Sequence, residues 1–125
     1  MLNEVRLIGR LTKDAEKREI KDKGAFLNFS IAVNESYKKD GQWQERTDYF
    51  DVEMFVKNPE ALEKRLKKGN QVLVIGKLRQ NIWEDEDGNK HSKVKVQAQR
   101  VVLLKSVEAT TSEEVAEDIE EGVDF

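Results

Sequence analysis

The strongest constraint on the fold is a repeat of apolar residues, spaced two apart, between positions 26 and 33. Successive side chains of a β-strand point to opposite faces, so this spacing places alternate residues on one face. The repeated apolar residues are Leu27, Phe29, Ile31 and Val33. The segment is therefore predicted to be a strand with one face in a hydrophobic core.

A second segment, residues 49–55, has the same period. One predicted face is apolar and carries Phe50, Val52 and Met54, whereas the other carries Tyr49, Asp51, Glu53 and Phe55. A sheet packed on one face and solvated on the other is typical of antiparallel structure. We expect the mixed aromatic and acidic face to be exposed.

The remaining strands are predicted from short β-rich runs and from the turn residues beside them. Strands are predicted over residues 5–11, curving at Gly9, and over residues 71–78, which contain Gly76. The dipeptide at positions 87 and 88, Asp-Gly, predicts a hairpin turn between Trp83 and a last strand that runs to Leu104.

A single short helix is predicted between residues 58 and 69. Asn58 is expected to cap it, Pro59 to occupy its first position and Gly69 to stop it. Leu62 and Leu66 lie four residues apart and form its apolar face. Several strands with a helix between the third and fourth are the layout of an all-β OB-fold, a five-stranded Greek-key barrel. Periodicity alone supports only a small β-barrel.

The charge divides the chain into two parts. Residues 1–105 hold all 22 basic residues against 17 acidic ones, a net charge of +5, whereas residues 106–125 hold eight acids and no base. The first part is long enough for one domain. The second is too polar to fold alone and is predicted to be a disordered acidic tail.

Several function classes are disfavoured. The chain has no cysteine and a single histidine, His91, which we expect to be a solvated surface residue, so no metal or cofactor is expected. No signal peptide or membrane segment is recognisable, and a cytoplasmic protein is expected. Asp48 is predicted to point away from Asp51 and Glu53, so these carboxylates do not converge on a catalytic cation. We expect no enzymatic activity.

Aromatic and basic residues suggest binding to a nucleic-acid strand. Aromatic rings can stack on any base, at about 1 to 3 kcal/mol per base, while lysine and arginine contact phosphates. The aromatic candidates are Tyr37, Tyr49, Phe55 and Trp83; Trp43 is interpreted as a clamp on a loop. The alternative for any single ring is ordinary packing in a sheet.

Five motifs in order resemble the bacterial-type single-stranded-DNA-binding protein family: NEVRLIGRLTKD, NESYKK with RTDYFDVEMF, LKKGNQVLVIGKLR, IWEDEDGNK, and an acidic end with a terminal Phe. The resemblance covers residues 3–105 and the last few residues. It implies an OB-fold that assembles as a homotetramer, binds single-stranded DNA in replication, recombination and repair, and associates with the nucleoid. It also implies that replication and repair proteins bind the C-terminal tip.

Position by position, the resemblance implies roles for particular residues. The base-stacking residues would be Tyr37, Tyr49, Phe55 and Trp83, and the phosphate contacts Arg18, Lys57, Lys68 and Arg79. The partner-binding tip would comprise Asp118, Glu120, Glu121, Asp124 and Phe125.

Three departures from the family pattern qualify these roles. Asp51 and Glu53 place carboxylates on the presumed DNA face, where they are expected to repel phosphates. Asn81 and Ile82 stand where the family often has basic residues. This departure and the two carboxylates each predict a lower DNA affinity or a smaller dependence of that affinity on salt. The tail lacks the usual long linker, and Asp124 stands where a proline is common.

Two other functions are compatible with a small barrel. The first is an OB module that binds structured RNA or a primosome assembly, for which the acidic tail has no evident use. The second is a metal-dependent nuclease, which magnesium-dependent cleavage of single strands would reveal.

Overall fold

The structure is a computed structural model that describes residues 1–107 and 117–119. These residues form one short helix and seven strands. The elements are β1 (Val5–Leu11), β2 (Glu16–Ile20), β3 (Gly24–Lys39), β4 (Gln42–Val56), α1 (Glu60–Arg65), β5 (Gln71–Glu84), β6 (Lys90–Lys105) and β7 (Glu117–Ile119).

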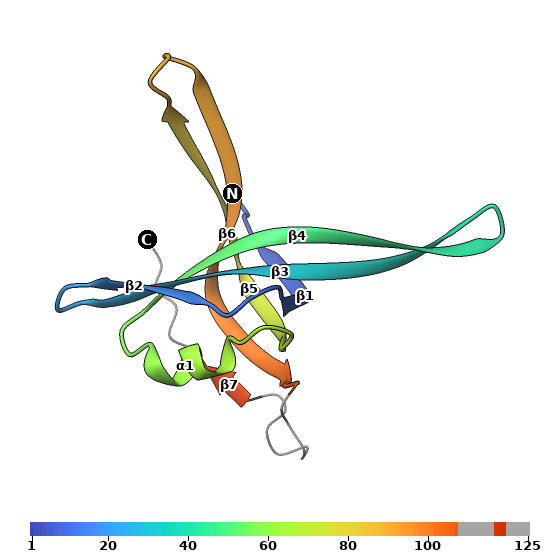
Figure 1. Cartoon of the computed structure of the whole chain (residues 1–125), viewed down its shortest axis with the longest axis horizontal. Coiled ribbons are helices and arrows are strands. Elements are labelled where there is room, and N and C mark those ends of the chain that lie inside the picture. The colour runs from blue at the N-terminus through green and yellow to red at the C-terminus, as the bar shows by residue number, and fades with distance from the viewer. Residues whose placement is uncertain (108–116, 120–125) are drawn as a thin grey trace.

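The strands form a closed barrel. Their order is β1-β5-β6-β4-β3-β2, and an additional pairing between β1 and β3 closes the ring (Figure 1). Every pairing is antiparallel except the short parallel one between β4 and β6. β1 and β2 both pair with β3 and act as two pieces of one bent strand. With that strand counted once, α1 lies between the third and fourth strands, and the predicted OB-fold is confirmed.

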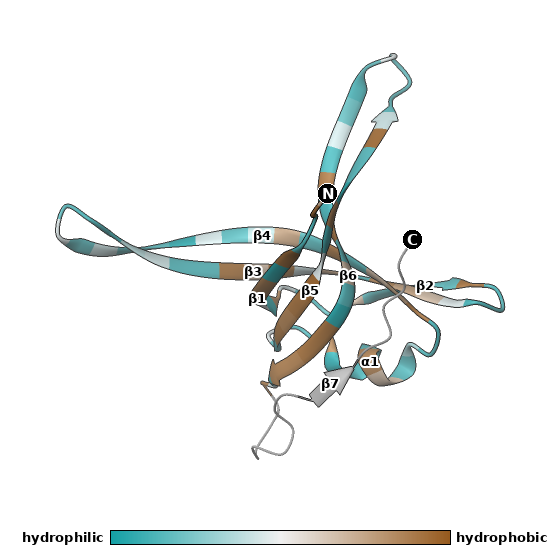
Figure 2. Ribbon diagram, turned by 180° about the vertical axis from the view of Figure 1, so that it is seen from behind, coloured by the Kyte–Doolittle hydropathy of each residue, from teal (hydrophilic) through white to brown (hydrophobic). Residues whose placement is uncertain are grey.

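The core is the apolar face that the alternation predicts. Leu27, Ile31 and Met54 are completely buried. Figure 2 shows apolar residues concentrated in the barrel strands, where β1, β5 and β6 come together. Leu62 and Leu66 are buried in the same cluster, so α1 packs on the barrel as predicted.

The predicted helix boundaries were only partly right. Pro59 occupies the N-cap position and no side chain caps the helix, so the capping role expected for Asn58 is wrong. The helix ends at Arg65, and Gly69 lies in the following turn with a φ of 86°. The helix is therefore shorter than the 58–69 segment suggested.

Two hairpin arms extend from the barrel in different directions (Figure 1). The β3–β4 arm keeps a continuous register out to the pair Lys39–Gln42, and Asp40 and Gly41 make its turn with positive φ angles of 51° and 79°. The β5–β6 arm ends in the predicted Asp-Gly turn. Both arms are longer than the predicted strands because their outer parts are solvated on both faces and lose the apolar alternation (Figure 2).

Residues 106–125 were predicted to be a disordered tail. β6 ends at Lys105, and the backbone of β7 pairs with β6 through Ile119–Val101 and Glu117–Leu103. Residues 108–116 and 120–125 lie outside the described residues, so the prediction stays a prediction there. None of the described helical residues forms a segment long and apolar enough to cross a membrane.

Candidate nucleic-acid interface

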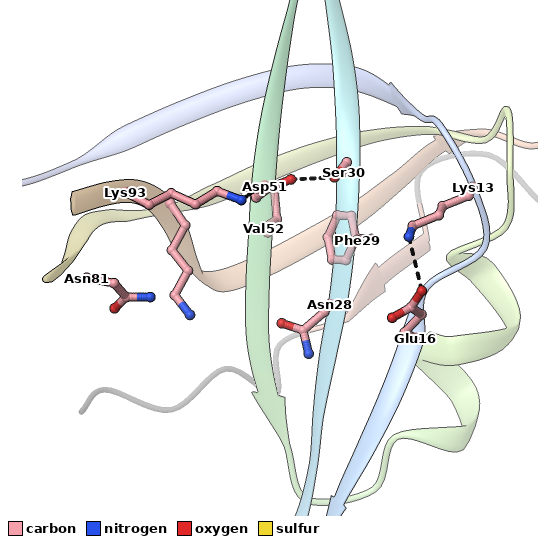
Figure 3. Close-up of a pocket in the computed structure, with 10 residues that line it drawn as sticks. Lys13, Glu16, Asn28, Phe29, Ser30, Asp51, Val52, Asn81 and Lys93 are labelled. Carbon is pink, nitrogen blue, oxygen red and sulfur yellow. Dashed lines mark hydrogen bonds and ion pairs between the residues drawn. The ribbon is translucent and has the colours of Figure 1, made fainter. Parts of the chain in front are cut away.

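A groove lies between the outer face of β3–β4 and the base of the β5–β6 arm. It consists of three adjoining pockets of about 300, 200 and 300 Å³. Lys95 lines all three, which makes them one continuous surface. Figure 3 shows the first of these pockets, with Asp51 and Ser30 on the strand face and Lys93 reaching in from β6.

The outer face of β4 forms one wall of this groove. Tyr49, Asp51, Glu53 and Phe55 alternate with Val52, Met54 and Val56, which are buried. The predicted division of this strand into a packed and a solvated face is confirmed. The aromatic and acidic side chains point outward because the intervening apolar residues fill the barrel.

Tyr49 is an open aromatic surface at one end of the groove. It lines the third pocket, and 69% of its area is exposed. Ala32 lies directly across from it on β3. A methyl group is too small to cover the phenol ring, so the ring remains available for stacking.

Phe55 lies in an aromatic cluster near the other end. Its ring packs edge-on against Phe26, with centroids 5.3 Å apart and an interplanar angle of 68°. The Arg18 guanidinium lies 4.9 Å from the Phe26 centroid. Cation–π and edge contacts together orient these groups. Phe26 thus connects two predicted site residues that are far apart in sequence.

Trp83 stands on the β5–β6 arm and is about half exposed. His91 stacks on it at 5.5 Å with an interplanar angle of 23°, and His91 Nε2 lies 2.7 Å from an Asp85 carboxylate oxygen. His91 is exposed, as expected of a surface residue, and it also supports one face of the indole. The hydrogen bond from His91 holds the pKa of Asp85 below its ordinary value.

Tyr37 is not on the same face of the β3–β4 ribbon as Tyr49 and Phe55. In the β3–β4 register Tyr37 lies opposite Gln44, whereas Trp43 lies opposite Lys38. Trp43 has the same strand parity as Tyr49 and Phe55, and Tyr37 has the opposite one. Trp43 is 73% exposed in a strand, so its interpretation as a loop clamp is wrong.

The four predicted phosphate contacts are dispersed. Arg79 lines the second pocket with Phe26, and Arg18 lies over Phe26. Lys57 lines a separate pocket of about 620 Å³ beside α1 and the β2–β3 turn. Lys68 follows α1, where its backbone N–H donates a hydrogen bond to Asp14 over 2.8 Å. Only the two arginines belong to the groove region.

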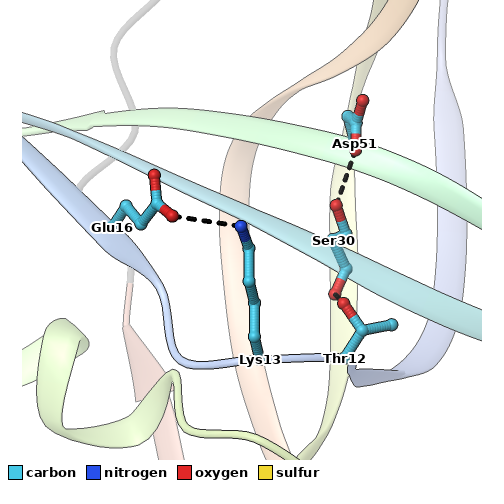
Figure 4. Close-up of polar contacts among 5 residues, drawn as sticks. All are labelled: Thr12, Lys13, Glu16, Ser30 and Asp51. Carbon is cyan, nitrogen blue, oxygen red and sulfur yellow. Dashed lines mark hydrogen bonds and ion pairs between the residues drawn. The ribbon is translucent and has the colours of Figure 1, made fainter.

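The carboxylates in the groove are paired with lysines. Lys93 Nζ lies 2.5 Å from an Asp51 oxygen, and Lys95 Nζ lies 2.8 Å from Glu53 Oε2. The Ser30 hydroxyl donates to Asp51 over 2.6 Å (Figure 4). The predicted acidic patch is therefore two neutral ion pairs. Weaker phosphate binding stays a prediction, and its expected cause is now the loss of two free lysine charges instead of repulsion by carboxylates.

These contacts predict how the groove responds to pH. The hydrogen bond from Lys93, and then that from Ser30, lowers the pKa of Asp51 below its ordinary value of 3.8. Stabilisation from such a group is present above the ordinary pKa and is lost as pH falls through the lowered one. We expect the Asp51–Lys93 pair to persist as the pH falls to 3.8 and to be lost only as the pH falls through the lowered pKa of Asp51. NMR titration of the Asp51 carboxyl checks this, and a midpoint above 4 would contradict it.

Lys93, Lys95 and Phe26 were missed as site residues. The sequence did carry a signal for them, because each neighbours an apolar residue of the alternating row and so belongs to the opposite, outer face of its strand. Phe26 precedes buried Leu27, and Lys95 precedes buried Val96. The sequence does not show, however, that β6 pairs alongside β4 and brings Lys93 and Lys95 to the carboxylates of that strand.

The remaining predicted residues add no catalytic geometry. Asp48 forms an ion pair with Arg46 at 3.2 Å and has the opposite strand parity from Asp51. Across residues 1–107 and 117–119, no group of three potential ligands is placed to hold a metal ion. In the predicted tip, the Asp118 backbone belongs to β7, whereas Glu120, Glu121, Asp124 and Phe125 lie outside the described residues.

Comparison with known proteins places this geometry in context. A "Single-stranded DNA-binding protein" of Treponema pallidum is 42% identical over 106 residues, 85% of this chain and 60% of the relative. One from Borreliella burgdorferi is 40% identical over 84% of this chain and 71% of the relative. The chain thus spans less than two thirds of the Treponema protein's length.

A structural neighbour agrees on the fold. A solved Plasmodium falciparum SSB complex with ssDNA has a TM-score of 0.69 at 24% identity, covering 78% of this chain and 87% of the other. The model of the Single-strand binding protein family matches residues 2–104. This chain belongs to the Single-strand binding protein family.

Proposed function

We propose that this protein binds single-stranded DNA with little sequence preference. The observation that carries the proposal is a groove lined by Tyr49, Phe26 and Arg79. Phe55 and Arg18 both contact Phe26 beside it. Every base offers a π-face, so exposed rings can hold a strand regardless of sequence. The DNA-binding relatives and the DNA-bound structural neighbour support the same proposal.

The groove chemistry favours a single strand over a duplex. A duplex keeps its bases stacked on one another, so it cannot offer their faces to Tyr49 or Trp83. The basic side chains attract phosphates without reading sequence. Stacking then supplies the preference for unpaired strands, and we assign it to Tyr49, Phe55, Trp83 and, on the other face of its arm, Tyr37.

We further propose the cellular role that the family resemblance suggests. The protein would protect single strands in replication, recombination and repair, and recruit protein partners through its acidic segment around Asp118 and Phe125. It would act as a homotetramer, an assembly for which the half-exposed Ile8 on β1 offers apolar contact surface. The proposed role is binding, of DNA and of protein partners, and no catalytic step is assigned.

Titration with poly-dT tests the proposal. We expect DNA to quench tryptophan emission and affinity to fall with salt, with a slope of roughly −0.7 for each phosphate contacted. Duplex DNA of the same length serves as the control and should bind far more weakly. Absence of both quenching and salt dependence would refute DNA binding.

Two further measurements address assembly and the acidic segment. Light scattering of the free protein should give four times the mass of one chain. A variant lacking residues 118–125 should bind poly-dT more tightly, because its acids no longer repel DNA. Preference for structured RNA over poly-dT would instead favour the RNA-binding alternative.

A further inference from the structure

Trp43 is the most exposed aromatic residue for which the structure gives a clear position on a strand. It lies on β4 near the end of the β3–β4 arm, and 73% of its area is exposed. All residues from Asn34 to Thr47 are exposed, so the indole contributes nothing to the barrel core. A large apolar ring on a solvated hairpin therefore has no packing role within the described chain.

The position of Trp43 continues a row of aromatic residues. Phe55, Tyr49 and Trp43 follow one another at intervals of six residues along β4. An even interval returns the side chain to the same face of a strand, and six residues span about 20 Å. The groove face of β4 thus carries an aromatic ring at its base, its middle and its outer end.

The side chains between these rings are polar and locally satisfied. Ser30 donates to Asp51, and Thr47 Oγ1 donates to Asn34 Oδ1 over 2.7 Å. The opposing residues on β3 along the path from Tyr49 to Trp43 are Ala32, Asn34 and Ser36, whose side chains are small.

Charge around Trp43 suits a phosphate backbone. Lys38 lies directly opposite Trp43 on β3. Among the described residues, no carboxylate forms an ion pair with Lys38, in contrast to Lys93 and Lys95 in the groove. Glu45 shares this face but lies opposite Ser36, two residue pairs closer to the barrel. A ring beside a free ammonium group is the combination that binds a nucleotide by stacking and phosphate contact.

We propose that Trp43 and Lys38 form an additional nucleotide-binding position, and that the bound strand runs from the groove past Tyr49 along this face of the β3–β4 arm. The inference rests on the proposed function and goes beyond it, because it gives the strand a direction and adds a stacking residue. Tyr37 lies on the other face of the arm, so a strand on this path does not reach it.

A single-tryptophan variant tests the contact directly. In Trp83→Phe the only tryptophan is Trp43, and saturating poly-dT is expected to quench its emission. A gel shift on the same samples reports whether DNA is bound. Unchanged emission with DNA bound would overturn this inference alone, whereas absence of binding in the wild-type protein would overturn the proposed function as well.

Affinity measurements supply an independent test. Trp43→Ala should weaken poly-dT binding about 5- to 150-fold, the range for one stacked base. Trp43→Phe should retain most of the affinity because it keeps a ring. Gln44→Ala, on the opposite face of the same arm, is the matched control and should bind normally.

A contact between copies of the chain is the competing explanation for an exposed tryptophan. It predicts that Trp43 emission in the Trp83→Phe variant changes with protein concentration before DNA is added. That result, together with unchanged DNA affinity in Trp43→Ala, would contradict the proposal.

Discussion

Replacement of both groove carboxylates, Asp51→Asn with Glu53→Gln, is expected to tighten poly-dT binding roughly 25-fold at about 0.1 M salt. Lys93 and Lys95 now have carboxylate partners at 2.5 and 2.8 Å. The amides keep the size of the side chains but remove their charge, which frees both ammonium groups to contact phosphates. The salt slope should steepen by about 1.4, since each phosphate contact on a single strand contributes roughly 0.7.

The two numbers in this prediction are linked. Counterion release makes the electrostatic part of log K proportional to the logarithm of salt concentration, so two extra contacts increase affinity most in dilute salt. Fluorescence titrations at several salt concentrations measure both quantities. The variant and the wild-type protein should converge as salt approaches about 1 M.

A variant with the same change in net charge provides the control. Glu60→Gln with Glu86→Gln removes two exposed carboxylates that line none of the groove pockets. It should change affinity far less than the groove variant. Equal effects from both variants would mean that overall charge, and not release of Lys93 and Lys95, governs binding. An unchanged slope in the groove variant would place the strand elsewhere.

Gly76→Ala is expected to lower the free energy of unfolding by about 3 kcal/mol or more. A Cβ atom on Gly76 would lie 2.1 Å from the carbonyl oxygen of Gln97 and 2.8 Å from the Ala98 Cα. These are backbone atoms of the neighbouring strand, so relief requires β5 and β6 to separate. Gly76 also pairs with Val5 on β1, which leaves little room to move the other way.

The location of Gly76 makes this change informative. The β5–β6 register is irregular between Ile75 and Gly76, where the two strands leave the barrel to form the arm. Urea unfolding followed by circular dichroism measures the loss, and a melting temperature lower by on the order of 15 °C should accompany it. Gln80→Ala, at an exposed position farther along β5, should cost less than about 0.5 kcal/mol. A similarly small loss for Gly76→Ala would show that the root of the arm relaxes easily.

Much of the barrel could be predicted because the relevant signals are local. The spacing of Leu27, Phe29 and Ile31 indicates a half-buried strand regardless of what packs against it. The Asp-Gly turn was predictable because that dipeptide tolerates positive φ, and Gly88 has a φ of 80°. The helix was found from two leucines, although its cap was not.

The ends of the strands could not be predicted from the same signals. β3 continues to Lys39 and β4 begins at Gln42, but the residues of this arm are solvated on both faces. Hairpin hydrogen bonds extend these strands without requiring an apolar face. For this reason Trp43 was assigned to a loop, and its shared parity with Tyr49 was not recognised.

The sequence by itself determined which side of β3 and β4 faces the core, that a short helix follows Asn58, that a turn lies at positions 87 and 88, and that the basic charge is separate from the acidic segment. Those properties depend on neighbours within a few positions. Only the tertiary structure decided that Lys95 pairs with Glu53 and that Arg18 lies over Phe26. Such contacts depend on strand order and register, which the packing of the whole core selects and which no single segment encodes.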